Sequence, residues 1–248
     1  MAPEVIVVAN RKGGTAKTTT VVNLAHQLAV QQQRVLILDL DNQGHIEFGF
    51  GHKLSPVPQA QWLETTPMFK GLFRFNPWID LALADTRLGE EEQPVKLHSF
   101  CYLLEQSDIQ HHYDVVLIDT PPTLGPVLLA ALAAANRIVI PAEPTPLASD
   151  GVDKLLKACT RAIQSRRFRA SRIEILPVMV DKHLTLHRQT LRQWVSRFGH
   201  DRVLPAIRRN IKLAEAFSRQ QPVAEYAPRC AGAQDYKALC KTLFIHQR

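Results

Sequence analysis

A loop near the start of the chain, residues 10–20, combines glycine, lysine and threonine in an order suited to phosphate groups. Gly13 and Gly14 carry no Cβ, so backbone N–H groups can close around phosphate oxygens. Lys17 is placed to reach the terminal phosphates of a nucleotide, and the Thr18 hydroxyl to bind Mg²⁺. The loop therefore predicts a nucleotide site made by Gly13, Gly14, Thr15, Ala16, Lys17, Thr18 and Thr19.

Two positions depart from the common phosphate-loop pattern, GxxxxGK followed by serine or threonine. Arg11 stands where the first glycine would be, and Ala16 stands where the last glycine would be. Alanine is the mildest replacement, and we expect the helix start at position 16 not to require a positive φ. The replacement then bears on nucleotide affinity and not on the existence of the loop.

Aspartates follow two further apolar segments, each of which is typical of a buried parallel strand. Asp39 ends residues 34–39, Asp41 follows two positions later, and Asp119 ends residues 113–119. Because the carboxyl ends of parallel strands face the ligand crevice, these carboxylates should lie beside the phosphate loop. Asp119 is predicted to hold Mg²⁺ directly or through water.

Apolar segments and helical patterns alternate along the chain, and they would position these groups. Strands are predicted at residues 5–9, 34–39, 79–84, 113–119, 137–141 and 173–180. Helices are predicted after the loop and at residues 97–106, 128–135, 149–164 and 186–198. Ser149 or Asp150 is the predicted N-cap of the helix at residues 149–164. This order indicates an α/β fold in one domain, residues 1–248: a P-loop NTPase with a mostly parallel twisted sheet and helices on both faces.

Three stretches resemble the ParA/MinD family of ATPases. The run KGGTAKTT at residues 12–19 is similar to the family's deviant phosphate loop, KGGxGKT. Residues 39–44 resemble its DxDPQG motif, with Asn42 in place of proline, and residues 207–233 resemble its C-terminal part. The resemblance covers nearly the whole chain, is weakest at residues 51–110, and leaves no room for a DNA-binding domain before Glu4.

The resemblance implies ATP and Mg²⁺ as cofactors and assigns roles to residues that spacing alone does not. Lys12 would reach across a dimer interface to the partner's nucleotide, and Asp41 would orient the attacking water. Asp39 would support the magnesium shell. Adenine would lie at the end of a strand, against Pro177, Met179 and Asp181.

Charge is segregated between the two parts of the chain. Residues 1–150 hold 10 Lys and Arg against 16 Asp and Glu, whereas residues 151–248 hold 20 against 7. Such asymmetry indicates a polyanion-binding surface on the basic part. The candidates for contacting DNA phosphates are Arg188, Arg192, Arg208, Arg209, Lys212 and Arg219, along with the arginines of residues 166–172. We expect roughly half of these candidates to be solvated charges or structural ion pairs instead.

The remaining composition favours a cytoplasmic protein. Apolar residues make up 46% and charged residues 21% of the chain, and no apolar run is long enough to span a bilayer. No leader peptide precedes the first strand, and four scattered cysteines suit a reducing compartment. The ten histidines lack metal-ligand spacing.

Together these features predict a ParA-type ATPase. With ATP it would form a homodimer around two nucleotides, bind double-stranded DNA without sequence preference and associate with the nucleoid. A ParB-like or adaptor protein would stimulate its slow hydrolysis, so that a cargo is segregated or positioned. The alternatives are a MinD-like ATPase at a membrane, a non-hydrolysing scaffold suggested by Ala16, and a metabolic enzyme of the same superfamily. The end of the chain, residues 236–248, has apolar residues at helical spacing, which we interpret as core packing and not as a membrane anchor.

Overall fold

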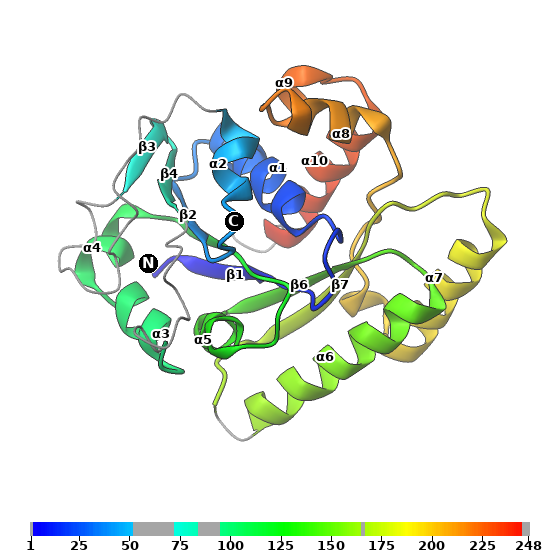
Figure 1. Cartoon of the computed structure of the whole chain (residues 1–248), viewed down its shortest axis with the longest axis horizontal. Helices are drawn as coiled ribbons and strands as arrows, with labels where there is room; N and C mark the ends of the chain where they lie inside the picture. The colour runs from blue at the N-terminus through cyan, green and yellow to red at the C-terminus, as the bar shows by residue number, and fades with distance from the viewer. Residues whose placement is uncertain (1, 52–71, 84–94, 165–166, 245–248) are drawn as a thin grey trace.

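A computed structural model of the chain describes residues 2–51, 72–83, 95–164 and 167–244. Arg166 and Ala84, which belong to predicted features, lie outside the described residues. The described part contains a seven-stranded sheet in which all pairs are parallel except the one at one edge, β3 with β4 (Figure 1). Its spatial order is β3 (Phe73–Asn76), β4 (Ile79–Ala82), β2 (Val35–Asp39), β5 (Val115–Asp119), β1 (Glu4–Val8), β6 (Arg137–Ala142) and β7 (Arg172–Pro177). The predicted α/β class with a mostly parallel sheet is confirmed.

Alternating side chains of the central strands divide the core into two layers. Val7 of β1 packs into one layer, whereas Ile6 and Val8 pack into the other. Figure 1 shows the same division in the ribbon. One face carries α1 (Lys17–Val30), α2 (His45–Phe50), α8 (Ile211–Ser218), α9 (Val223–Tyr226) and α10 (Ala231–Phe244). The other face carries α3 (Ser99–Leu104), α4 (Ser107–His112), α5 (Pro126–Ala134), α6 (Pro146–Gln164) and α7 (Thr185–Phe198).

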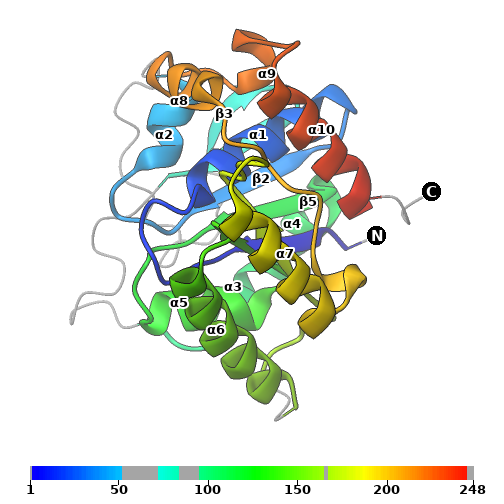
Figure 2. The ribbon, with the colours of Figure 1, turned by 90° about the vertical axis from the view of Figure 1, so that its right-hand side faces the viewer.

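The end of the described chain is part of the core. Tyr236, Leu239 and Leu243 of α10 are at most 3% exposed, and they pack in the same layer as α1. Figure 2 shows α10 lying beside α1, with α8 and α9 at the same side. The interpretation of these apolar residues as packing is confirmed. Within the described residues, no helix has the length and apolar character needed to cross a bilayer.

Two predicted boundaries were wrong. Helix α6 begins at Pro146 and not at residue 149, because proline suits the first turn and the Thr145 hydroxyl accepts the N–H of Ala148 at 3.3 Å. The prediction had placed this cap at Ser149 or Asp150, which lie inside the helix. Strand β7 ends at Pro177, beyond which Val180 makes only an isolated bridge to Arg208.

The register brings the ends of three strands to one edge of the sheet. Val8 of β1 is the partner of Asp119 in β5, and Asp119 is also the partner of Asp39 in β2. The phosphate loop leaves β1 directly after Val8 and leads into α1. The sheet therefore places the loop and the two strand-terminal carboxylates next to one another, as the motifs predict.

Candidate nucleotide site

Hydrogen bonds within the protein hold the loop between β1 and α1 in shape. The Asn10 side chain donates to the carbonyl of Pro141 at the end of β6, over 2.7 Å, and accepts the N–H of Lys12 over 3.0 Å. The Thr15 hydroxyl donates to the carbonyl of Lys12 over 3.2 Å. Gly14 has a φ of +70°, and a Cβ placed on it would meet no atom within 4 Å. The loop backbone thus faces open space that a phosphate group can occupy.

Ala16 differs from the prediction. Its φ of 61° and ψ of 30° lie in the left-handed region, so this position does require the positive φ that glycine adopts freely. The Ala16 carbonyl accepts both the backbone N–H of Thr20, at 2.9 Å, and the Thr20 hydroxyl, at 2.7 Å. These two hydrogen bonds form the first turn of helix α1 and hold Ala16 in its strained conformation. The expectation of an ordinary φ was wrong because the turn into α1 sets the backbone, whatever side chain it carries.

Lys17 and Thr18 occupy the first turn of α1 and face the strand ends. Lys17 is only 7% exposed, and burial lowers its pKa, against the opposing effect of the negative charges of Asp119 and Asp41. The Thr18 hydroxyl donates to Asp119 Oδ2 over 2.6 Å. A partly desolvated ammonium group beside two carboxylates is suited to binding the charged end of a nucleotide.

Asp39 and Asp119 are fully buried and adjacent. Burial raises the pKa of Asp119 to about 7, although the hydrogen bond from Thr18 and the charge of Lys17 lower it. Burial and the charge of Asp119 raise the pKa of Asp39 well above its usual range. The Asp39 carboxylate also accepts the N–H of Asp41 at 3.0 Å. Asp41 is 6% exposed, and its Oδ1 accepts the N–H of Gln43 at 3.2 Å, which closes the turn after β2.

These oxygen atoms fit a magnesium ion. Mg²⁺ is bound by few protein oxygens together with substrate phosphates and waters, and a threonine hydroxyl 2.6 Å from a carboxylate provides such a pair. A cation there would also compensate the crowded charges of Asp39 and Asp119. Among the described residues no cluster of three or more His, Cys, Asp or Glu side chains forms a separate metal site.

A cavity of about 670 Å³ continues from the phosphate loop. Its volume lies within the range of small-molecule sites, roughly 300–1,000 Å³. The wall includes Ala16, Thr19, Met179, residues 207–211, Phe217 and Tyr236. A second cavity of about 680 Å³ lies at the amino end of β7, around Arg172 and Arg202, at the opposite end of that strand from the nucleotide loop.

One of the three residues predicted near adenine lines the cavity beside the loop. Met179 does so with a φ of 54°. Pro177 is instead buried in β7, where its carbonyl accepts the N–H of Ile207 at 2.8 Å. The Asp181 carboxylate accepts the N–H of His183 at 2.9 Å and does not line the cavity. The motif analysis missed Phe217 and Tyr236, which contribute to the wall from α8 and α10 without any local signature.

The six candidate DNA-binding residues between Arg188 and Arg219 fall into two groups. The first group consists of structural ion pairs: Arg208 with Asp235 at 2.7 Å, Arg209 with Glu143 at 3.0 Å and Lys212 with Glu215 at 2.6 Å. The second group, Arg188, Arg192 and Arg219, is exposed and makes no ion pair within the described part of the chain. Arg188 donates to the Thr185 hydroxyl at 3.1 Å. Lys12, predicted to act across a dimer, is also exposed.

Comparisons with known proteins agree with this geometry. A model of an AAA domain family matches residues 3–171. The chain is 33% identical over 247 residues to the chromosome-partitioning ATPase Soj of Treponema pallidum, covering 96% of each chain. It is 34% identical over 253 residues to the protein of the same name from Thermus thermophilus, covering 95% of this chain and 93% of that one.

Solved structures show the same fold. McdA of Cyanothece in complex with ATP superposes with a TM-score of 0.84 at 19% identity, covering 98% of this chain and 96% of that chain. Cobyrinic acid a,c-diamide synthase of Mycobacterium smegmatis, with ADP and magnesium bound, gives 0.80 at 28% identity over 99% and 95%. ATP and Mg²⁺ are the cofactors that these similar structures and the donor set support. By its sequence, its fold and its deviant phosphate loop, the chain belongs to the ParA/MinD superfamily of P-loop ATPases.

Proposed function

We propose that this ATPase is a ParA-type positioning protein that hydrolyses ATP slowly and acts as a nucleotide-dependent dimer on DNA. The observation that carries the proposal is the cluster of Lys17, Thr18, Asp119 and Asp41 at the carboxyl end of the sheet, with an exposed Lys12 beside it. Such a cluster can bind a triphosphate, and the accessible lysine is free to reach a second protomer.

Each residue of the cluster has one role in phosphoryl transfer. Lys17 and the loop amides hold the phosphates, and Asp41 orients the attacking water. Thr18 and Asp119 would hold Mg²⁺, with Asp39 supporting them, and the ion would supply positive charge beside the phosphate oxygens. The Asp41 side chain is largely buried beside Lys17, which keeps it close to where the terminal phosphate would lie.

The proposed DNA surface uses the exposed arginines that make no ion pair with the residues that the structure describes. Arg188 and Arg192 lie one helical turn apart on α7, and Arg219 follows α8. Guanidinium groups on phosphates displace counterions and read no bases, so binding should be salt-dependent and insensitive to sequence. A dimer would double these contacts and thereby link DNA binding to ATP. We infer a cytoplasmic, nucleoid-associated protein whose hydrolysis a ParB-like or adaptor protein stimulates.

Two other functions remain as alternatives. A MinD-like membrane role would need an amphipathic helix with a free apolar face, whereas the apolar residues of α10 lie in the core. The second alternative is a small-molecule synthetase, which the 28% identity to the cobyrinic acid enzyme suggests. Phosphate release without any added organic substrate separates the proposed function from that second alternative.

Phosphate release by two variants tests the assigned roles. Lys17→Ala should abolish ATP binding, because it removes the cation that meets the terminal phosphates. Asp41→Ala should still bind ATP but lose turnover, because its carboxylate acts on the water and not on the nucleotide. Turnover of Asp41→Ala at the wild-type rate would remove Asp41 from the mechanism.

A further inference from the structure

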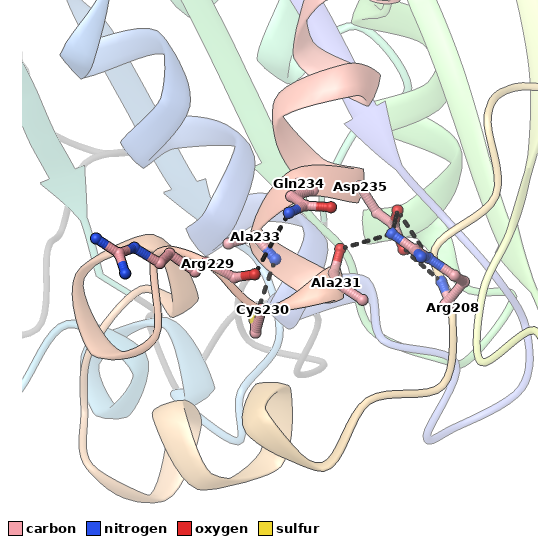
Figure 3. A network of polar contacts seen from close by, with 7 residues as sticks. All are labelled: Arg208, Arg229, Cys230, Ala231, Ala233, Gln234 and Asp235. Atoms are coloured by element: carbon pink, nitrogen blue, oxygen red, sulfur yellow. Dashed lines mark hydrogen bonds and ion pairs between the residues drawn. The ribbon is translucent and has the colours of Figure 1, made fainter.

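One aspartate binds both the side chain and the backbone of a residue in the cavity wall. Arg208 Nε donates to Asp235 Oδ2 at 2.9 Å, and Nη2 donates to Oδ1 at 2.7 Å. The backbone N–H of Arg208 donates to Oδ2 as well, at 2.9 Å. Figure 3 shows the guanidinium lying against this carboxylate, in the first turns of α10, with a further bond to the carbonyl of Ala231 at 3.4 Å. The side chain of Asp235 is only 11% exposed.

The segment that Asp235 holds is the wall of the cavity beside the phosphate loop. Residues 207–211 all line that cavity. On its other side the segment pairs with the chain beyond β7, where Val180 donates to the carbonyl of Ile207 at 3.0 Å and accepts the N–H of Arg209 at 2.9 Å. The backbone at Arg208 is thus fixed between β7 and α10.

Helix α10 is a rigid support for this contact. Tyr236, the next residue, is 1% exposed and lines the same cavity. Its hydroxyl lies 3.3 Å from the hydroxyl of Thr20 in α1, the helix that begins in the phosphate loop. Asp235 therefore fixes the cavity wall relative to the phosphate loop through one continuous set of contacts.

This geometry exceeds what a surface ion pair needs. An exposed arginine–carboxylate pair contributes little to stability, and nothing requires it to take up a backbone N–H. Here two guanidinium nitrogens and one backbone nitrogen converge on a single carboxylate, which orders the segment and not only the side chain. Ordering a binding wall in advance lowers the entropy lost when a ligand binds.

We propose that Asp235 is a positioning residue for the base of the nucleotide, holding residues 207–210 through Arg208 so that the base pocket exists before ATP arrives. The inference rests on the proposed function, with the base of ATP placed in this cavity, which begins at Ala16 and Thr19 of the phosphate loop and includes Met179. It assigns Arg208 to the nucleotide pocket and removes it from the DNA surface. Asp235 does not itself line the cavity, so its removal should weaken binding of the base and leave binding of the phosphates intact.

Calorimetric titration of the full chain with Mg²⁺ and either ATP or inorganic tripolyphosphate separates these two contributions. Asp235→Ala should weaken ATP about tenfold, which corresponds to about 1.4 kcal/mol, and leave tripolyphosphate within about twofold of the wild type. The matched control is Asp153→Ala, which breaks the pair of Asp153 in α6 with Arg197 in α7, away from the cavity. The control should leave both ligands unchanged.

Asp235→Asn keeps an oxygen that can accept the Arg208 N–H, and it should show a smaller loss in the same direction if Asp235→Ala does not fold. Unchanged ATP affinity in the variant that is measured would overturn the inference. A parallel loss of ATP and tripolyphosphate would overturn it too, since that is the result of a purely structural role. Wild-type protein that binds ATP no better than tripolyphosphate would instead refute the base pocket itself, and this inference with it.

Discussion

The strained alanine of the phosphate loop can be tested by one substitution. Ala16 has a φ of 61°, a conformation that costs a non-glycine residue about 1–2 kcal/mol. Ala16→Gly would remove that cost. Glycine also has more conformational freedom in the unfolded chain, which lowers the free energy of unfolding by about 0.4–1 kcal/mol. The half-buried methyl group of Ala16 packs against the core layer that contains α1. Removing it destabilises the folded protein by part of the about 0.8 kcal/mol that a fully buried CH₂ contributes.

The balance favours Ala16→Gly by about 0.5 kcal/mol. For a chain of this size, 1 kcal/mol shifts Tm by about 2–4 °C, so we expect Tm to rise by about 1–2 °C. The control is Ala158→Gly, an exposed position inside α6, where glycine should cost about 1 kcal/mol and lower Tm by about 2–4 °C. The two substitutions are chemically identical. The positions differ in backbone conformation and in the burial of the methyl group, which is half-buried at position 16 and exposed at position 158.

Thermal unfolding followed by circular dichroism, without nucleotide, measures both variants free of ligand effects. The expected result is a difference in Tm of about 3–6 °C between the two variants, with opposite signs relative to the wild type. Destabilisation of Ala16→Gly equal to that of Ala158→Gly would refute the assignment of strain to position 16.

Two further predictions concern assembly and DNA. Light scattering of Asp41→Ala with ATP should show a dimer, which an added Lys12→Ala should weaken, because Lys12 is proposed to bind the partner's nucleotide; a monomer at every concentration would contradict the dimer. Anisotropy titrations with two unrelated duplexes should show equal affinity that falls with salt concentration. Replacing Arg188 and Arg192 by alanine should reduce the slope of log affinity against log salt concentration by about 1 for each DNA phosphate that the protein no longer neutralises. An unchanged slope would place the DNA surface elsewhere.

Local sequence determined the phosphate site almost completely. Glycines, Lys17 and Thr18 act within a few residues of one another, and a parallel sheet aligns the carboxyl ends of its strands, so Asp39 and Asp119 were predictable neighbours. The positions of β1, β2 and β5 followed from apolar runs typical of buried parallel strands, and the predicted bounds lie within about two residues of the observed ones.

Only the tertiary structure decided the backbone of Ala16, the base cavity and the state of the basic residues. The positive φ of Ala16 is set by the turn that joins β1 to α1, and an alanine at this position does not by itself indicate a positive φ. Side chains from α8 and α10, among them Phe217 and Tyr236, form part of the cavity wall although these helices lie far along the chain from the loop. Arg208 and Arg192 look alike in the sequence, yet of these two only Arg208 forms an ion pair within the described part of the chain, with Asp235. Ion pairing depends on distances in space that the order of residues does not specify.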